Sequence, residues 1–79
     1  MTRDEILVRL QGPFRKVFGD PGLRVVDGTT AADVPDWTSL RHVDLIVAVE
    51  QDFGIRFSTR EVRQLPNVGA LVDLIARKT

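Results

Sequence analysis

Ser39 and His42 are the two residues whose types and spacing suggest chemistry. They are three positions apart, so a helix would bring both onto one face. A serine beside a histidine could be a nucleophile with its base, but the sequence shows neither an orienting acid nor an oxyanion hole. A serine at a helix start usually only caps it, yet the free N–H groups and positive dipole end there also stabilise a phosphate ester. A cap, a nucleophile and a phosphate attachment point are therefore the three interpretations of Ser39.

The composition excludes several other kinds of site. The 79 residues include no cysteine and one histidine, which excludes disulfides, thiolate nucleophiles, cysteine-ligated zinc and multi-histidine metal sites. The 11 basic and 11 acidic residues balance, so no global field attracts nucleic acid or an anionic membrane. A hydrophobic content of 43% predicts one small globular domain over residues 1–79. We expect a monomer without bound metal or nucleic-acid partner.

The N-terminal residues indicate a cytoplasmic protein. Asp4 and Glu5 stand where a signal peptide has basic residues, and Arg9, Gln11 and Pro13 interrupt the apolar stretch that follows. No apolar run reaches the length of a membrane-spanning helix. We therefore expect a cytoplasmic location without membrane insertion.

Residues 2–18 are predicted to form a first helix. Thr2 and Glu5 make a capping-box pattern, and apolar residues then recur at helical spacing. Pro13 lacks a backbone donor, so we expect a kink or a helix that stops and restarts; the uninterrupted apolar register favours the kink. The apolar face consists of Ile6, Leu7, Leu10, Phe14, Val17 and Phe18.

Residues 19–36 are predicted to form a long loop. The stretch is rich in Gly, Pro, Asp and Thr and has no extended helical periodicity. Val25 and Val26 could alternatively form a very short strand. Trp37, which follows the loop, is interpreted as an anchor that packs it against the helices. Other apolar anchors are Leu23, Val25, Val26 and Val34.

A second helix is predicted from Thr38 or Ser39 to about Phe53, where Gly54 suits a left-handed C-terminal cap. Two apolar stripes can be drawn on it, and so small a bundle can bury only one of them fully. We expect the first stripe to face the core and the second to face solvent. The first contains Leu45, Ile46, Val49 and Phe53, and the second Leu40, Val43 and Val47.

Two further helices complete the prediction. Ser58 or Thr59 caps a short one near residues 60–65, which Pro66 ends. Asn67 caps the last one, whose apolar stripe is Val68, Leu71, Val72 and Ile75. The expected fold is an all-α bundle of three longer helices and one short helix, with a long loop between helices one and two.

Two stretches carry a resemblance to the acyl carrier proteins. Residues 36–55 read DWTSLRHVDLIVAVEQDFGI, which is similar to the family signature of a Ser-Leu pair opening a helix that ends in acidic residues and Phe. Residues 66–75, PNVGALVDLI, are similar to the family's last helix. The resemblance implies a small four-helix carrier domain that is not an enzyme. Residues 29–37, TTAADVPDW, are closest to stand-alone carriers of secondary-metabolite and cell-surface pathways.

The resemblance implies a cofactor and its partners. Ser39 would carry a covalent 4′-phosphopantetheine arm, which a phosphopantetheinyl transferase takes from coenzyme A. Acyl- or aminoacyl-activating and transferring enzymes would then load and unload thioesters in a specialised pathway. His42 is expected at the surface near the arm. One departure is that Thr38 replaces the family's usual aspartate, so the carboxylate beside the serine is lost.

The resemblance also implies that the second helix is the docking element for partner enzymes. Because the chain is formally neutral, unlike strongly acidic carriers, docking should depend more on apolar contact than on long-range charge. Two alternatives stay open: an unmodified interaction module with the carrier fold, and a small hydrolase that uses Ser39 and His42. The predicted docking residues are Leu40, Arg41, Val43, Asp44, Val47 and Glu50.

Overall fold

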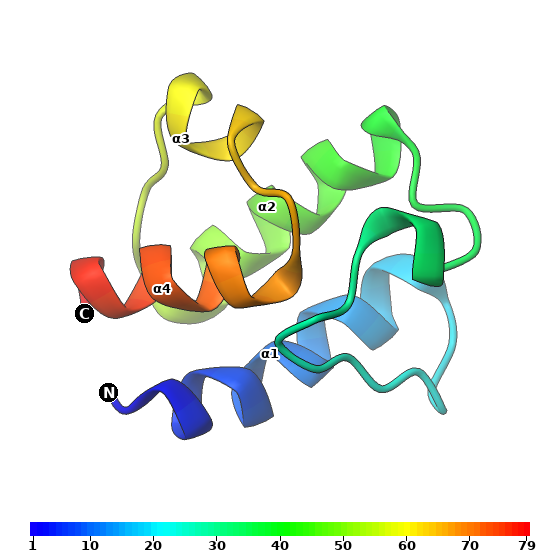
Figure 1. Ribbon diagram of the computed structural model, residues 1–79, viewed down its shortest axis with the longest axis horizontal. Helices are drawn as coiled ribbons and strands as arrows, with labels where there is room; N and C mark the ends of the chain where they lie inside the picture. Colours follow the sequence, from blue (N-terminus) through cyan, green and yellow to red (C-terminus); the bar gives the residue numbers. More distant parts are fainter.

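The computed structural model describes all 79 residues as a helical bundle (Figure 1). No β-strand forms, so the alternative strand at Val25 and Val26 is wrong. No helix has the length and apolar character needed to cross a membrane. The all-α prediction is confirmed, and the elements are α1 (Arg3–Phe18), η1 (Ala31–Asp33, a 3-10 turn), α2 (Ser39–Phe53), α3 (Thr59–Arg63) and α4 (Val68–Lys78).

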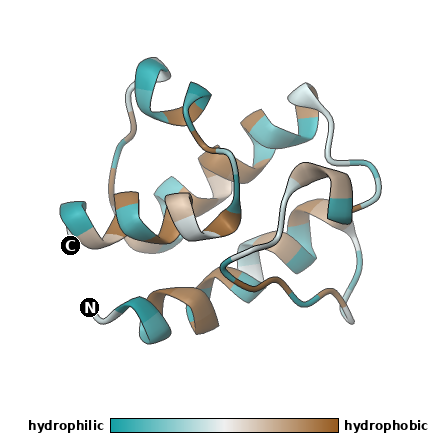
Figure 2. Cartoon of the chain, viewed as in Figure 1, coloured by the Kyte–Doolittle hydropathy of each residue, from teal (hydrophilic) through white to brown (hydrophobic).

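The long helices pack around a single hydrophobic core. α1 lies against both α2 and α4. Hydrophobic and hydrophilic residues alternate along each of these helices, as expected where one face is in the core and the other in solvent (Figure 2). The largest fully buried side chains include Phe14, Ile6, Leu10, Leu45 and Ile75.

α1 begins and continues as its sequence dictates. The Thr2 hydroxyl accepts from the Glu5 backbone N–H at 3.1 Å, and the Glu5 carboxylate accepts from the Thr2 N–H at 2.9 Å. These bonds lower the pKa of Glu5. The helix continues through the buried Pro13, so it does not stop and restart there. It ends at Gly19, whose φ of 63° is the left-handed cap that glycine favours.

The loop between α1 and α2 is fixed by a side chain of α1. The Gln11 amide accepts from the Val25 N–H and donates to the Val25 carbonyl, both at 2.9 Å. This places Val25 in the core with 1% of its surface exposed. The loop is also less irregular than expected, because η1 forms within it. A three-residue turn has no periodicity from which to predict it.

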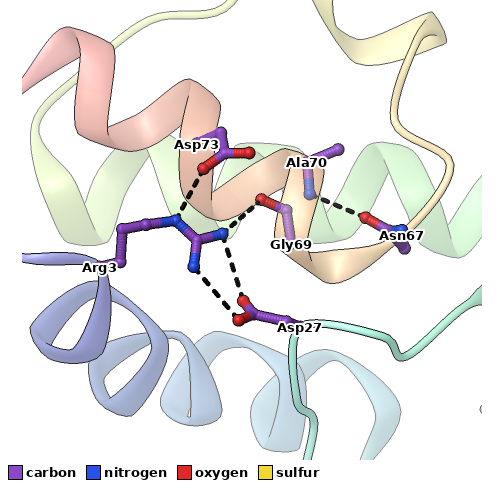
Figure 3. A network of polar contacts seen from close by, with 6 residues as sticks. All are labelled: Arg3, Asp27, Asn67, Gly69, Ala70 and Asp73. Carbon is purple, nitrogen blue, oxygen red and sulfur yellow. Dashed lines mark hydrogen bonds and ion pairs between the residues drawn. The ribbon is translucent and has the colours of Figure 1, made fainter.

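Arg3 joins α1 to the loop and to α4 (Figure 3). Its guanidinium lies 2.7 Å from the Asp73 carboxylate and 3.2 Å from that of Asp27. The pKa of Arg3 is raised, mainly by the hydrogen bond to Asp27 and next by the hydrogen bond to Asp73. Gly69 donates its N–H to the Asp27 carbonyl at 2.8 Å. Asn67 caps α4 as predicted, since its side chain accepts from the Ala70 N–H at 2.8 Å.

α3 is shorter than predicted, and side-chain contacts cap it and attach it to α4. It ends at Arg63, not Leu65, because Leu65 precedes Pro66, and a residue before proline is sterically disfavoured in the helical conformation. Ser58 is its cap, accepting from the Glu61 N–H at 3.2 Å. Glu61 in turn pairs with Lys78 of α4 at 3.1 Å.

Candidate functional site

Ser39 is the first residue of α2, and its side chain is exposed. The preceding residue, Thr38, is the cap: its hydroxyl accepts from the Arg41 N–H at 3.3 Å. The start of α2 therefore does not depend on the Ser39 hydroxyl, which is free for other chemistry.

A tight turn before α2 allows Trp37 to be half-buried while Ser39 stays exposed. Asp36 has a φ of 67°, the left-handed region that aspartate tolerates better than most residues, and its carbonyl accepts from the Thr38 N–H at 2.8 Å. Trp37 is half-buried beyond this turn, while Thr38 and Ser39 are exposed.

Trp37 packs the loop against the bundle, as predicted. Its ring meets that of Phe14 edge-on at 5.4 Å between centroids and lies 5.9 Å from that of Phe18. Its indole N–H donates to Nδ1 of His42 at 3.2 Å, and Nε2 of His42 lies 3.2 Å from the Val62 carbonyl oxygen. An indole N–H can only donate, so Nδ1 is the acceptor and Nε2 carries the proton that it donates to Val62.

This arrangement corrects the expectation for His42. The side chain is half-buried and joins α2 to both Trp37 and α3, so it is not a free surface residue. A general base needs an unshared nitrogen within hydrogen-bond reach of the nucleophile. Both ring nitrogens of His42 already have partners, and the hydrolase alternative with Ser39 loses its base.

An open cleft of about 530 Å³ lies beside Ser39, between the start of α2 and α3. This volume falls within the range of roughly 300–1,000 Å³ typical of small-molecule sites. Most of its wall is apolar or aromatic, and Arg63 is its one formally charged lining residue. The wall includes Trp37, Ser39, His42, Val43, Val62 and Leu65.

The two apolar stripes of α2 face opposite ways, as the sequence predicts. Leu45, Ile46 and Val49 are buried, whereas Leu40, Val43 and Val47 are 74%, 59% and 45% exposed. Phe53, expected in the core, is only half-buried, and the Arg9 guanidinium lies 4.8 Å from its ring centre. The exposed stripe thus presents an apolar surface beside Ser39.

The three charged residues of the predicted docking set are placed differently from one another. Asp44 is exposed on α2. Arg41 is also exposed, but its guanidinium reaches the Val17 carbonyl at 3.4 Å, at the end of α1 and not at Ser39. Glu50 is half-buried, and its carboxylate accepts from the Phe57 N–H at 2.8 Å. Glu50 therefore has a structural contact, and its docking role stays a prediction.

Sequence reasoning missed the contribution of α3 to the site. Val62, Arg63 and Leu65 line the cleft, but a helix of five residues has too little periodicity to reveal which face it turns inward. In the sequence, Arg63 is only one of 11 basic residues, and no pattern sets it apart. Nothing in the sequence indicates that the Val62 carbonyl would meet His42.

Comparison with known proteins identifies the family. The family described as "Phosphopantetheine attachment site" matches residues 37–75. An acyl carrier protein of Acidothermus cellulolyticus is 37% identical over 79 residues, covering the whole of this chain and 94% of that protein. The chain belongs to the acyl carrier protein family. A solution structure of a holo acyl carrier protein from Geobacter metallireducens matches with a TM-score of 0.85 and 40% identity, over 91% of this chain and 83% of that one.

The site fits the cofactor of this family, 4′-phosphopantetheine, which acyl carrier proteins hold covalently. The matched stretch contains an exposed serine at the first position of a helix, where the first backbone N–H groups lack intrahelical acceptors. A cleft of small-molecule size opens beside it. Acyl carrier proteins are carriers and not catalysts. This agrees with the two hydrogen bonds that occupy both ring nitrogens of His42.

Proposed function

We propose that this chain carries acyl or aminoacyl intermediates as thioesters on a 4′-phosphopantetheine arm attached to Ser39. The observation that best supports Ser39 as the attachment point is that a different residue, Thr38, caps α2. Thr38 caps the helix, so the exposed Ser39 hydroxyl can be esterified without loss of the cap. The proposed role is not enzymatic, and the thiol of the arm supplies the acyl-carrying chemistry.

The residues around Ser39 would hold the phosphate of the arm. The N–H groups of Ser39 and Leu40 lie in the first turn of α2, where no carbonyl of the same helix accepts from them. The positive end of the helix dipole adds to the attraction for an anion. The cleft offers the arm an apolar surface on which its methylene groups can rest.

We further propose that α2 docks the partner enzymes, namely the phosphopantetheinyl transferase and the enzymes that load and unload the arm. Leu40, Val43 and Val47 form an exposed apolar stripe that no part of the chain covers. Scattered exposed apolar residues are ordinary, but a row on the helix that also presents Ser39 is suited to a partner. The chain's neutrality favours apolar contact over charge steering.

The specialised pathway rests on the resemblance of residues 29–37 to stand-alone carriers of secondary-metabolite and cell-surface pathways. In the structure this segment holds η1 and the turn at Asp36, and it ends at Trp37 beside the cleft. The sequence of this segment therefore helps to shape the wall of the cleft, against which a cargo would lie. A monomeric state and a cytoplasmic location stay predictions from the sequence.

Intact mass spectrometry tests the proposal directly. The chain is produced with a broad-specificity phosphopantetheinyl transferase, and we expect the wild type to gain the mass of one arm. Ser39→Ala should gain none, while its free energy of unfolding changes by no more than about 1 kcal/mol because Thr38 keeps the cap. Ser58→Ala is the matched control, since Ser58 is the chain's one other serine and also lies at a helix start.

A second comparison tests the unmodified interaction module. Thr38→Asp restores the family's usual carboxylate beside Ser39 and keeps a capping side chain. A transferase adapted to Asp-Ser-Leu should modify this variant faster than the wild type, because the carboxylate adds a charge-assisted contact. Equal rates would show that position 38 does not limit recognition. Absence of modification in both proteins with every transferase tried would favour the unmodified module.

A further inference from the structure

The charges of the chain balance overall, but they are not evenly spread along it. Residues 54–79 contain five basic residues and two acidic ones. Both acidic residues are already engaged, because Glu61 pairs with Lys78 and Asp73 pairs with Arg3. The arginines of this stretch take part in none of the four ion pairs of the chain; they are Arg56, Arg60, Arg63 and Arg77.

Two of these arginines border the exposed apolar stripe of α2, one near its start and one near its end. Arg63 lines the cleft that also contains Ser39 and Val43. Arg56 lines a second, open hollow that also contains Val47. Both arginines are exposed. A partner that covers the stripe would therefore meet a guanidinium group at each end of it.

The acidic side chains nearest to this surface do not neutralise the two arginines. No acidic residue lines the cleft that contains Arg63. The hollow that contains Arg56 has one acidic residue, Glu50, and its carboxylate accepts from the Phe57 N–H at 2.8 Å and pairs with no arginine. The positive charge beside the stripe is thus left for a group outside the chain.

From these observations, and resting on the proposed docking of partner enzymes on α2, we propose that those enzymes present carboxylates to Arg56 and Arg63. An apolar surface on the enzyme would cover the stripe, and acidic side chains at its rim would pair with the two guanidinium groups. Charge pairs at a rim fix the register of docking and disfavour partners whose surface has the wrong sign. Because the chain is neutral as a whole, these contacts are local and add to apolar docking.

An acidic protein surface fits these arginines better than an anionic membrane. Residues 19–53, which include α2, contain seven acidic residues and two basic ones. Among them Asp44 is exposed on α2 and takes part in no ion pair. A uniformly anionic surface would repel these carboxylates, whereas an enzyme can place carboxylates opposite the two arginines alone.

The test uses the cognate phosphopantetheinyl transferase, because this enzyme has to dock at Ser39 to attach the arm. Intact mass gives kcat and KM for the wild type, Arg56→Gln and Arg63→Gln. At low salt we expect each substitution to lower kcat/KM by about 1.5-fold to fivefold, the range that corresponds to one exposed ion pair. The loss should lie in KM, and it should disappear at about 1 M salt, where the Debye length is about 3 Å.

Arg77→Gln is the matched control. Arg77 is exposed and unpaired, and it lines neither of the two hollows beside the stripe. It lies near the C-terminal end of α4, which is far from the start of α2 (Figure 1). The substitution removes the same net charge, so we expect the wild-type rate at both salt concentrations.

Arg63→Lys tests for the carboxylate itself. The variant keeps the charge, and we expect it to keep most of the wild-type rate. Its new amine allows a carbodiimide to join position 63 to an acidic residue of the bound transferase through an amide bond. Peptide mass mapping should find this link to an aspartate or glutamate of the enzyme.

Three results would decide against the proposal or its basis. Rates of Arg56→Gln and Arg63→Gln equal to or above the wild-type rate at low salt would overturn it, as would an equal loss in Arg77→Gln, which would reduce the effect to net charge. Unchanged rates together with weaker binding of both variants to phosphatidylglycerol vesicles would assign the arginines to a lipid surface and overturn it too. A wild-type chain that takes up no arm would instead refute the proposed function.

Discussion

Trp37 donates its indole N–H to Nδ1 of His42 over 3.2 Å, and their rings stack with centroids 6.0 Å apart. The other ring nitrogen of His42 meets the Val62 carbonyl. One imidazole thus connects the loop, α2 and α3 at the wall of the cleft. Both ring nitrogens of His42 therefore have partners, and its neutral form is the one that satisfies both neighbours.

We expect His42→Leu to lower the free energy of unfolding by about 1–3 kcal/mol, because two hydrogen bonds of about 0.5–1.5 kcal/mol each are lost. Trp37→Phe removes the indole donor together with part of the packing area of the ring. Urea denaturation of the two single variants and the double variant gives their coupling energy, which should be positive and near that of one hydrogen bond. Additive effects would mean that the Trp37–His42 bond contributes nothing to stability. Nitrogen NMR of the ring should show a protonated Nε2 and an unprotonated Nδ1.

Val47→Asp and Val49→Asp place the same charge two residues apart on α2, but we expect the first to impair docking and the second to unfold the domain. Val49 is fully buried, so an aspartate there would bury an unpaired carboxylate and unfold the domain. Val47 is 45% exposed, and we expect a change of no more than about 1 kcal/mol in stability. Circular dichroism measures the folding, and the rate of loading by a cognate enzyme measures docking. Loading of Val47→Asp should fall while its helicity is kept; loading at the wild-type rate would remove Val47 from the docking surface.

Gly69→Ala should destabilise the domain by about 1–3 kcal/mol, the cost of forcing extra volume into a packed site. A Cβ atom at this position would lie 2.9 Å from the Asp27 carbonyl oxygen, a backbone atom that cannot turn away. The substitution would also disturb the Gly69 contact with Arg3 shown in Figure 3. Gly28→Ala is the control, since nothing lies within 4 Å of its added Cβ, and we expect it to be neutral or slightly stabilising. Thermal unfolding of both variants measures the difference, and equal melting temperatures would contradict the close approach.

Acid should loosen α3 through Glu61. The hydrogen bond from the Ser58 N–H is the main cause that lowers the pKa of Glu61 below its ordinary value of 4.5, and the hydrogen bond from Lys78 is the second. The ionised carboxylate therefore stabilises the fold; this contribution is complete above 4.5 and is lost as the pH falls through the lowered pKa. We expect Glu61→Gln to be less stable than the wild type near neutral pH and the difference to vanish in acid. Urea denaturation across this pH range is the measurement, and a difference that persists at the lowest pH would exclude Glu61 ionisation as the cause.

The long helices were predictable because each carries its own start, face and stop. For α2, the cap at Thr38, the buried face through Val49 and the left-handed Gly54 all lie within one continuous stretch of sequence. The same local signals left the cap open between Thr38 and Ser39, and the structure assigns it to Thr38, which makes Ser39 the first residue of α2. Such features require no knowledge of how the chain folds back on itself.

The wall of the site was not predictable for the opposite reason. His42 meets the carbonyl of a residue 20 positions later, and Gln11 fixes Val25 across 14 positions. Both contacts depend on how loops return to the bundle, which periodicity does not encode. By contrast, the conformational restriction that Pro66 places on Leu65 is a local rule, and it predicts that the short helix ends before Leu65.

The sparse attachment of α3 has a consequence for the timescale on which the cleft exists. Five residues of helix are held by the His42–Val62 bond, the Glu61–Lys78 pair and a few half-buried apolar side chains, so they can detach while α1, α2 and α4 stay packed. In hydrogen exchange, the α3 amides should open with a free energy well below that of global unfolding, whereas the amides at the centre of α2 should open only with the whole domain. The space beside Ser39 would then change between closed and open forms on the timescale of that local opening.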